Sequence, residues 1–373
     1  MTLSILWFIL VAVLWTVYLI LEGFDFGVGM LLPFAAKGDR ERTQMVRTIG
    51  PHWDGNEVWL LTAGGATFAA FPEWYATMFS GMYLALFLIL VCLIIRIMAL
   101  EWRSKVATEK WRRTWDWAHT ICAWLVPLLL GVAFANFVQG MKIEVIDVAT
   151  GTVVDPTLVN QSLASATHQL TGGFFSLLTP YTLLGGFAVL AVCLAHGAQF
   201  LALKTTGEVR DRANAIAAPA TIAATVLAAA WLVWGQFAYT TNVLAWIPLV
   251  VAALAIIVST VLSQSTLRRE GLSFAASSVA IAGTVAWVFA SMAPAVQKSS
   301  INPAYSLTIE QASSTTATLT VMTIVTVCLL PIVLAYVLWS YWTFRSRVGT
   351  EDVTTKTGLL MKKIRLGENF LAD

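Results

Sequence analysis

Long apolar runs separated by short polar segments dominate this chain of 373 residues. Each run has roughly the 20 residues that an α-helix needs to cross a bilayer, and none shows the alternating strands of about 10 residues that mark a membrane barrel. The pattern predicts an all-α, polytopic membrane protein with nine transmembrane helices. The expected helices cover residues 3–33, 52–71, 75–100, 116–139, 172–203, 214–239, 243–266, 273–294 and 316–344.

A weak internal repeat in the sequence suggests how the helices are grouped. EGFDF at 22–26 aligns with HGAQF at 196–200, and each stretch precedes a basic loop. The repeat predicts two four-helix bundles plus one extra helix. In the second unit, His196 and Gln199 stand at the positions that Glu22 and Asp25 occupy in the first. The expected parts are a first unit at 1–140, an external loop at 141–171, a second unit at 172–294, an external loop at 295–315, a ninth helix at 316–345 and a cytoplasmic tail at 346–373.

The polar segments between the helices are interpreted by their composition. Both external loops are polar, marked by Pro or Gly and rich in β-branched residues, so we expect ordered caps or partner contacts there. The tail is amphiphilic, and either lies along anionic lipid or is solvated.

Composition and charge agree with a membrane protein. Of the residues, 58% are hydrophobic and 12% are charged, about half the charged fraction of a soluble protein. The basic residues are scattered among short loops and form no tract beside aromatic side chains, which argues against nucleic-acid binding. Of the 23 Lys and Arg residues, all but Lys142 and Lys298 belong to loops on one side or to the tail. The positive-inside rule then places the N-terminus outside and the C-terminus in the cytoplasm.

Cysteine and histidine usage predicts no metal site. The four cysteines stand singly inside apolar runs, so we expect reduced core residues. His119 and His196 are interpreted as neutral core histidines, because no paired haem ligand is evident. The N-terminus lacks a basic leader and a cleavage site, so the first helix is expected to be retained.

Four carboxylates within the apolar segments are the strongest candidates for chemistry. Glu22 and Asp25 are three residues apart, as are Asp54 and Glu57, so each pair projects toward one helix face. An ionised carboxylate in hydrocarbon costs several kcal/mol and normally faces a bundle interior, a water-filled cavity or an ion path. The topology brings both pairs toward the cytoplasmic half.

Two interpretations of these acids stay open at this point. Closely placed carboxylates share protons, which suits a proton-loading or proton-relay site. Alternatively, the acids pair with basic residues and hold the helices together. This second interpretation is the better one for Glu22 and Glu57, which lie nearer the ends of their helices by pattern. The candidate partners are Arg47, Arg96 and His52. Arg96 and Glu101 near the end of an apolar run are typical of snorkelling anchors or helix-end partners.

Several long motifs resemble one family. EGFDFGVGMLLP, GPHWDGNEVWLLTAGGATFAAFP, WYATMFSGMY and LEWRSK are similar to segments of the smaller core subunit of cytochrome bd quinol oxidase. The resemblance continues through WRRTWDWAHTI, GVAFANFVQG and TPYTLLGGFAVLAVCLAHGAQFLALKT, so it covers most of the chain in order. The last third follows the pattern more loosely.

The resemblance implies a subunit of a bacterial cell-membrane complex that oxidises quinol and reduces dioxygen to water. It implies nine membrane helices, a larger haem-bearing partner subunit that carries haems b and d and the quinol site, and no cofactor on this chain. It also allows for a structural quinone, small single-helix accessory subunits and lipid contacts.

The same resemblance implies a route for cytoplasmic protons through this chain. By motif, the route involves Asp25, Trp53 and Asp54, and Glu101 stands where relatives can carry an aspartate. Supporting roles fall to Glu22, Glu57, His52 and Arg96. Two other functions fit the residues. The internal repeat and the intramembrane acids would also fit a proton-coupled secondary transporter, and the chain could instead be a purely structural assembly subunit.

Overall fold

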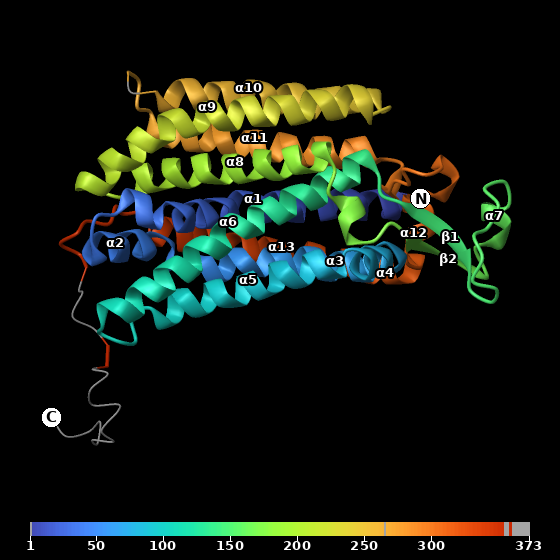
Figure 1. Cartoon of the computed structure of the whole chain (residues 1–373), viewed down its shortest axis with the longest axis horizontal. Coiled ribbons are helices and arrows are strands. Elements are labelled where there is room, and N and C mark those ends of the chain that lie inside the picture. The colour runs from blue at the N-terminus through green and yellow to red at the C-terminus, as the bar shows by residue number, and fades with distance from the viewer. Residues whose placement is uncertain (1, 265, 354–357, 360–373) are drawn as a thin grey trace.

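The computed structural model describes residues 2–264, 266–353 and 358–359. Its long helices lie side by side in one elongated bundle (Figure 1). These helices are α1 (Thr2–Ala35), α3 (Trp53–Ala70), α5 (Tyr83–Trp102), α6 (Glu109–Gln139), α8 (Pro180–Lys204), α9 (Gly207–Ala238), α10 (Trp246–Ser263), α11 (Glu270–Met292) and α13 (Thr316–Thr343).

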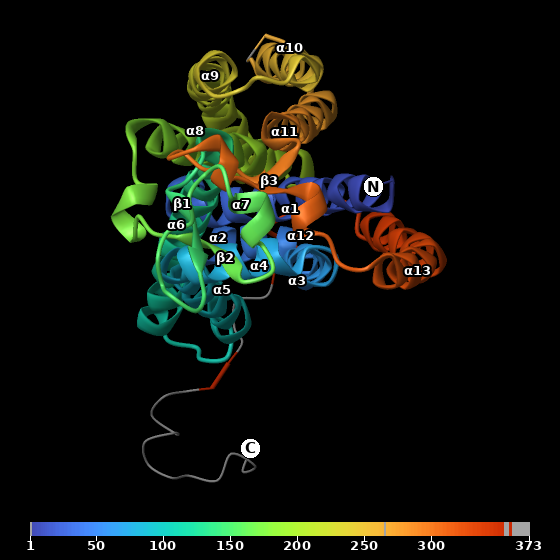
Figure 2. The ribbon, with the colours of Figure 1, turned by 90° about the vertical axis from the view of Figure 1, so that its right-hand side faces the viewer.

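Helix α1 is the centre of the bundle. It packs against α3 and α6 on one side and against α8 and α11 on the other, while α9 and α10 form an outer layer over α8 and α11 (Figure 2). Helix α1 therefore contacts helices on both of its sides to a similar extent, so a site built on α1 can be reached from either side of the bundle. The division into two four-helix units stays a prediction.

Eight helices in the described part of the chain are long and apolar enough to cross a membrane. They are all the long helices except α3. Helix α3 has 18 residues and packs against α1, but Asp54, Asn56 and Glu57 near its start make it more polar. The polytopic helical architecture is therefore confirmed, and the count of nine spanning helices stays a prediction.

Several helix boundaries differ from those expected. The helix expected at 75–100 is broken at Met82 into α4 (Pro72–Gly81) and α5. At the break, Gly81 lies so close to Leu170 that a Cβ on this glycine would overlap the Leu170 side chain. The helix expected from 172 begins only at Pro180, because Thr179 forms a capping box with Thr182. The helices expected from 116 and 214 begin about two turns earlier, at Glu109 and Gly207.

The first basic loop contains a helix that the apolar pattern does not predict. Helix α2 (Asp39–Ile49) is amphipathic and rich in charged residues, and it buries Gln44, Met45, Thr48 and Ile49. A segment of 11 residues with so few apolar positions falls below the length and hydropathy by which spanning helices are found. It marks the end of the bundle that is called the α2 end below.

The opposite end, called the hairpin end, carries the two polar segments. Strands β1 (Ile143–Asp147) and β2 (Ala166–Leu170) form an antiparallel pair around α7 (Val159–Ser162). The second segment contains β3 (Ala295–Gln297), β4 (Leu307–Thr308) and α12 (Ile309–Ala312). Three 3₁₀ turns, at Phe174–Leu177, Val243–Ala245 and Pro303–Tyr305, complete this end. The described part of the chain is mostly helical, as expected, and these short strands are the exceptions to an all-α fold.

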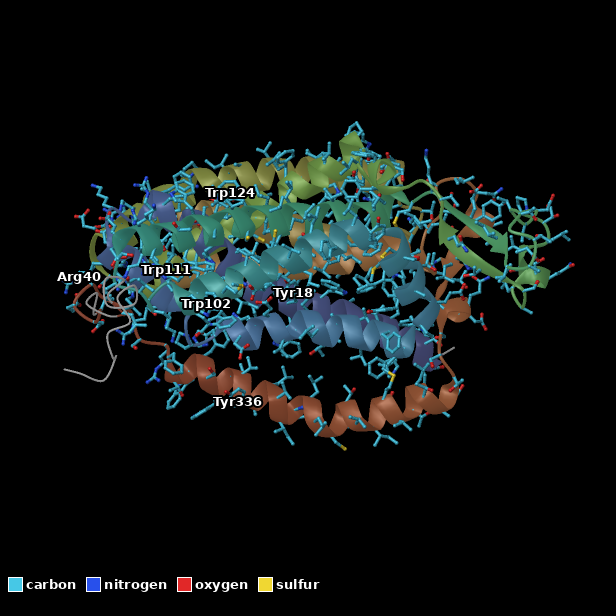
Figure 3. The ribbon with its side chains drawn as sticks, turned by 60° about the horizontal axis from the view of Figure 1, so that its bottom comes forward. Tyr18, Arg40, Trp102, Trp111, Trp124 and Tyr336 are labelled. Carbon is cyan, nitrogen blue, oxygen red and sulfur yellow. The ribbon has the colours of Figure 1, made fainter. Side chains whose placement is uncertain are left out.

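Helix α13 lies at the edge of the bundle (Figure 3). It contacts α1 and α3, and Trp7 of α1 donates a hydrogen bond to Thr323 at 3.0 Å. Cys328 on α13 is therefore exposed, contrary to the expected core position, whereas Cys92, Cys122 and Cys193 are buried free thiols. Most of the tail expected at 346–373 lies outside the described residues.

The crossing of α1 and α8 depends on two glycines. A Cβ on Gly27 would overlap the Cys193 carbonyl oxygen and the Gly197 backbone, and a Cβ on Gly197 would overlap Gly27 in return. We expect Gly27→Ala to destabilise the protein by about 1–3 kcal/mol, because backbone atoms must move apart. Thermal unfolding of the purified protein measures this. Gly55→Ala is the matched control, since nothing lies within 4 Å of a Cβ there.

Candidate functional site

A cluster of buried charged side chains lies where α1, α3 and α5 meet. Glu22 and Asp25 of α1 and Arg96 of α5 are each 0% exposed. One guanidinium nitrogen of Arg96 forms a salt bridge with the Glu22 carboxylate and lies 3.4 Å from a carboxylate oxygen of Glu57 on α3. Two acids thus contact one base, and Asp25 lies three residues after Glu22 on the same helix. The set of Glu22, Asp25, Glu57 and Arg96 is called the acid cluster below.

The surroundings of Arg96 are mostly apolar. Its guanidinium lies over the Phe26 ring at 4.8 Å from the ring centre, and the part of its helix that precedes it, Tyr83 to Ile95, is a continuous apolar run. Within the described residues, its Nε and Nη2 atoms have no hydrogen-bond partner. Buried donors of this kind are normally satisfied by internal water. Arg96 is therefore not the snorkelling anchor expected from its position, because the acids of two neighbouring helices hold it inside.

A chain of hydrogen bonds leads from the acid cluster to the last helix. Asn56 of α3 donates through Nδ2 to an Asp25 carboxylate oxygen at 2.7 Å. Its amide oxygen accepts a hydrogen bond of 2.8 Å from the Tyr341 hydroxyl of α13. The Tyr341 ring stacks on His52 at 4.1 Å between ring centres, so His52 covers this chain at the α2 end.

The other residues singled out from the sequence lie outside the cluster. Asp54 and Glu101 are exposed, and Trp53 is half-buried. The spacing of Asp54 and Glu57 suggests one shared face, but only Glu57 turns toward Arg96. The structure therefore brings Glu22, Asp25 and Glu57 together and leaves Asp54 at the surface one turn away.

Three further residues belong to the site and were missed from the sequence. Tyr18 is fully buried one helical turn before Glu22, and Figure 3 places it inside the bundle. Its spacing of four residues from Glu22 is a signal that could have identified it. Asn56 stands within the acidic motif itself, and its amide could have been assigned to the same face as the acids. Tyr341 is 285 residues from Asn56, and no local pattern predicts their contact.

The cluster holds more acids than its single base can compensate. Glu22 and Asp25 are both fully buried and stand three residues apart on one face of α1. Carboxylates that share a site titrate as a coupled set and exchange protons among themselves. Among the described residues, no group of three His, Cys, Asp or Glu side chains has an arrangement that could hold a metal ion. Proton storage and transfer are the chemistry that this arrangement suits.

The family model described as cytochrome bd terminal oxidase subunit II matches residues 3–344. The cytochrome bd ubiquinol oxidase subunit 2 of Bacillus subtilis strain 168 is 38% identical over 357 residues, covering 94% of this chain and 98% of the relative. The cytochrome bd-I ubiquinol oxidase subunit 2 of Escherichia coli K12 is 37% identical over 386 residues, with 95% and 97% covered.

A solved structure supports the fold. The bd oxidase from Geobacillus thermodenitrificans contains a chain that aligns with a TM-score of 0.69 and 16% identity, covering 92% of this chain and 99% of that one. Eight apolar helices and two relatives at 37–38% identity agree on a multi-pass membrane protein that works with a first subunit. The chain belongs to the cytochrome bd terminal oxidase subunit II family and is one subunit of an oxidoreductase complex of the respiratory chain.

Proposed function

We propose that this chain is the non-haem subunit of a quinol oxidase complex, that it stabilises a larger haem-bearing partner, and that its acid cluster supplies protons for the reduction of dioxygen to water. The relatives are named as ubiquinol oxidase subunits. Haems b and d and the quinol site are assigned to the partner subunit. The observation that carries the proton role is the cluster that the fully buried Glu22 and Asp25 and the partly buried Glu57 form with Arg96.

The proposed direction of proton flow follows from the basic residues. Arg40, Arg42 and Arg47 of α2 and Arg210 and Arg212 of α9 lie at the α2 end. By the positive-inside rule this end faces the cytoplasm and the N-terminus faces outside. The acid cluster then lies toward the cytoplasmic half of the bundle, where it can load protons from the cytoplasm.

The route that we propose begins at the exposed Asp54 and passes the half-buried Trp53 to the acid cluster. Asp25 is the central carrier, because its carboxylate is fully buried and is held by Asn56. Internal water, bound to the unpaired nitrogens of Arg96, completes the contacts. Glu101, exposed at the end of α5, is assigned to the surface from which protons are collected.

The other partners of the complex are proposed by analogy with the family. Lipid covers the apolar outer faces, and the quinol binds at the partner subunit. Small single-helix accessory subunits and a structural quinone are also proposed, without a place on this chain.

Two alternative functions are a proton-coupled transporter and an assembly subunit whose acids only hold helices together. The salt bridge between Arg96 and Glu22 is what an assembly subunit would need, so this alternative is tested separately, by the turnover of the assembled complex with Asp25→Asn.

Purification in mild detergent tests the proposed function. We expect the chain to co-purify with a larger haem protein, to absorb red light through that partner, and to oxidise quinol while consuming oxygen. A transporter would be purified alone and colourless. A colourless, inactive chain that is stable by itself would therefore contradict the proposal.

A further inference from the structure

The last turn of α13 lies beside the acid cluster, although little apolar packing holds it there. Tyr341 in this turn donates a hydrogen bond of 2.8 Å to the Asn56 amide oxygen, and Asn56 donates one of 2.7 Å to Asp25. Over the whole described helix Thr316–Thr343, the one fully buried residue is Leu319, near the opposite end. Contacts other than apolar packing must therefore fix the position of Tyr341.

A buried lysine holds the end of α13. Lys204 is the last residue of α8 and is 8% exposed. Its ammonium group donates to the Phe344 carbonyl oxygen and, at 2.9 Å, to the Ser346 carbonyl oxygen. Carbonyl groups at the end of a helix lack partners within the helix and carry partial negative charge, so a cation is favourable there. Lys204 thus ties α13 to α8 just beyond Tyr341.

The backbone after α13 is paired with the same part of α8. The Val348 amide donates to the Lys204 carbonyl oxygen at 2.8 Å, and the Thr206 amide donates to the Val348 carbonyl oxygen at 3.2 Å. Gln44 of α2 donates to that Val348 oxygen at 2.8 Å. The end of α13 is therefore joined to α8 and α2 around Lys204.

Aromatic contacts connect this joint with Tyr341. The Phe344 ring lies edge-on to the His52 ring at 5.8 Å between ring centres. The His52 ring in turn stacks on the Tyr341 ring at 4.1 Å. A shift of the Phe344 backbone would disturb this stack and lengthen the hydrogen bond from Tyr341 to Asn56.

The Tyr341 hydroxyl suits Asn56 in both protonation states of Asp25. As observed, Asn56 presents its NH₂ group to the Asp25 carboxylate and its oxygen to Tyr341, with a further contact of 3.4 Å from the nitrogen to the Leu21 carbonyl oxygen. A protonated Asp25 becomes a donor, and the amide can turn around to accept from it and to donate to the Tyr341 oxygen. Because a hydroxyl both donates and accepts, Tyr341 pairs with Asn56 in either orientation, which phenylalanine cannot do.

We propose that Lys204 and Tyr341 are positioning residues for the proton chemistry of Asp25. Lys204 fixes the end of α13, and Tyr341 thereby keeps the Asn56 amide paired whether Asp25 is ionised or protonated. Neither residue passes a proton itself. This inference rests on the proposed function, in which Asp25 is the central proton carrier.

Cryo-electron microscopy of the whole complex with Lys204→Met tests the positioning. We expect the Tyr341 hydroxyl to lie beyond hydrogen-bond distance of Asn56, because the end of α13 has lost its ammonium contact. Lys204→Arg should keep Tyr341 in place, since a guanidinium can donate to both carbonyl oxygens. Lys37→Met, at an exposed lysine of the same end, is the matched control. A Tyr341 that stays on Asn56 in Lys204→Met would overturn the inference.

Turnover per haem, measured across a range of pH, tests the effect on Asp25. Lys204→Met and Tyr341→Phe should each lower turnover roughly two- to tenfold, the range expected for the loss of one hydrogen bond, and should displace the pH profile in the same way. The double variant should lose no more than the larger single loss, because both changes act through one contact. Lys204→Arg should retain most of the turnover. The other titratable or charged groups on the elements that meet here keep their identity in these variants: Glu22, Asp25, His52, Glu57 and Arg96.

Two results would overturn the role of Lys204. One is an unchanged turnover and pH profile in fully assembled Lys204→Met, and the other is a double variant whose loss is the product of the two single losses. Asp25→Asn in the same assay separates this inference from the proposed function. If Asp25→Asn slows turnover and Lys204→Met does not, only the positioning role fails. If Asp25→Asn has no effect, the proposed proton role fails, and the positioning role fails with it.

Discussion

Replacing Arg96 by methionine is expected to destabilise the complex by about 3–5 kcal/mol, the cost of leaving buried charge without its partner. Methionine keeps much of the side-chain volume but removes the guanidinium that contacts Glu22 and Glu57. Both carboxylates would then lie in an apolar interior without a counter-charge. Thermal unfolding and the yield of haem-loaded complex measure the effect.

Two further variants isolate the cause of this loss. Arg345→Met removes an exposed arginine on a tryptophan ring and should change little. Adding Glu22→Gln to Arg96→Met should recover part of the stability, because it removes one of the unpaired carboxylates. If Arg96→Met alone were as stable as the unmodified complex, the acid cluster would not be what joins α5 to α1.

Asp25→Asn is expected to leave assembly intact and to lower quinol oxidase turnover by on the order of tenfold or more, the range of a lost proton-transfer group. Asparagine has the shape of aspartate, and its amide oxygen can still accept the hydrogen bond from Asn56. It cannot take up and release a proton in the same position. Oxygen consumption per haem measures turnover independently of yield.

Two surface acids serve for comparison with Asp25. Asp54→Asn should also slow turnover but by less, because Asp54 is exposed and water can partly replace it. Glu109→Gln, at an exposed position that begins α6, should have no effect. Equal losses in all three variants would indicate a general effect of surface charge.

The acid pairs were predictable because helical spacing and membrane energetics act locally. EGFD alone shows that Glu22 and Asp25 share a face, and the cost of burying them requires a partner. The identity of that partner was not predictable. An arginine near the end of an apolar run usually reaches water, and only the packing of α5 beside α1 and α3 directs Arg96 inward. Tyr341 joins the site only through the tertiary fold.

The fold shows the same division between local and tertiary causes. Continuous apolar runs were sufficient to predict the spanning helices to within a few residues at most ends. Helix α2 was missed because its buried face holds only four residues. The break at Met82 was missed because it lies beside a tertiary contact, between Gly81 and Leu170 of β2, that no local pattern shows. Asp54 was placed with Glu57 by spacing, although adjacent helices approach only one of the two.

The most direct test of the acid cluster as a proton route is the pH dependence of turnover in the assembled complex with Asp25→Asn. The proposed route predicts a large loss of turnover at every pH where proton delivery limits the rate, together with a changed pH profile, while haem content and thermal stability match those of the unmodified complex. Unchanged turnover with an unchanged pH profile in a fully assembled complex would contradict the proton role and leave the cluster as a lock between helices.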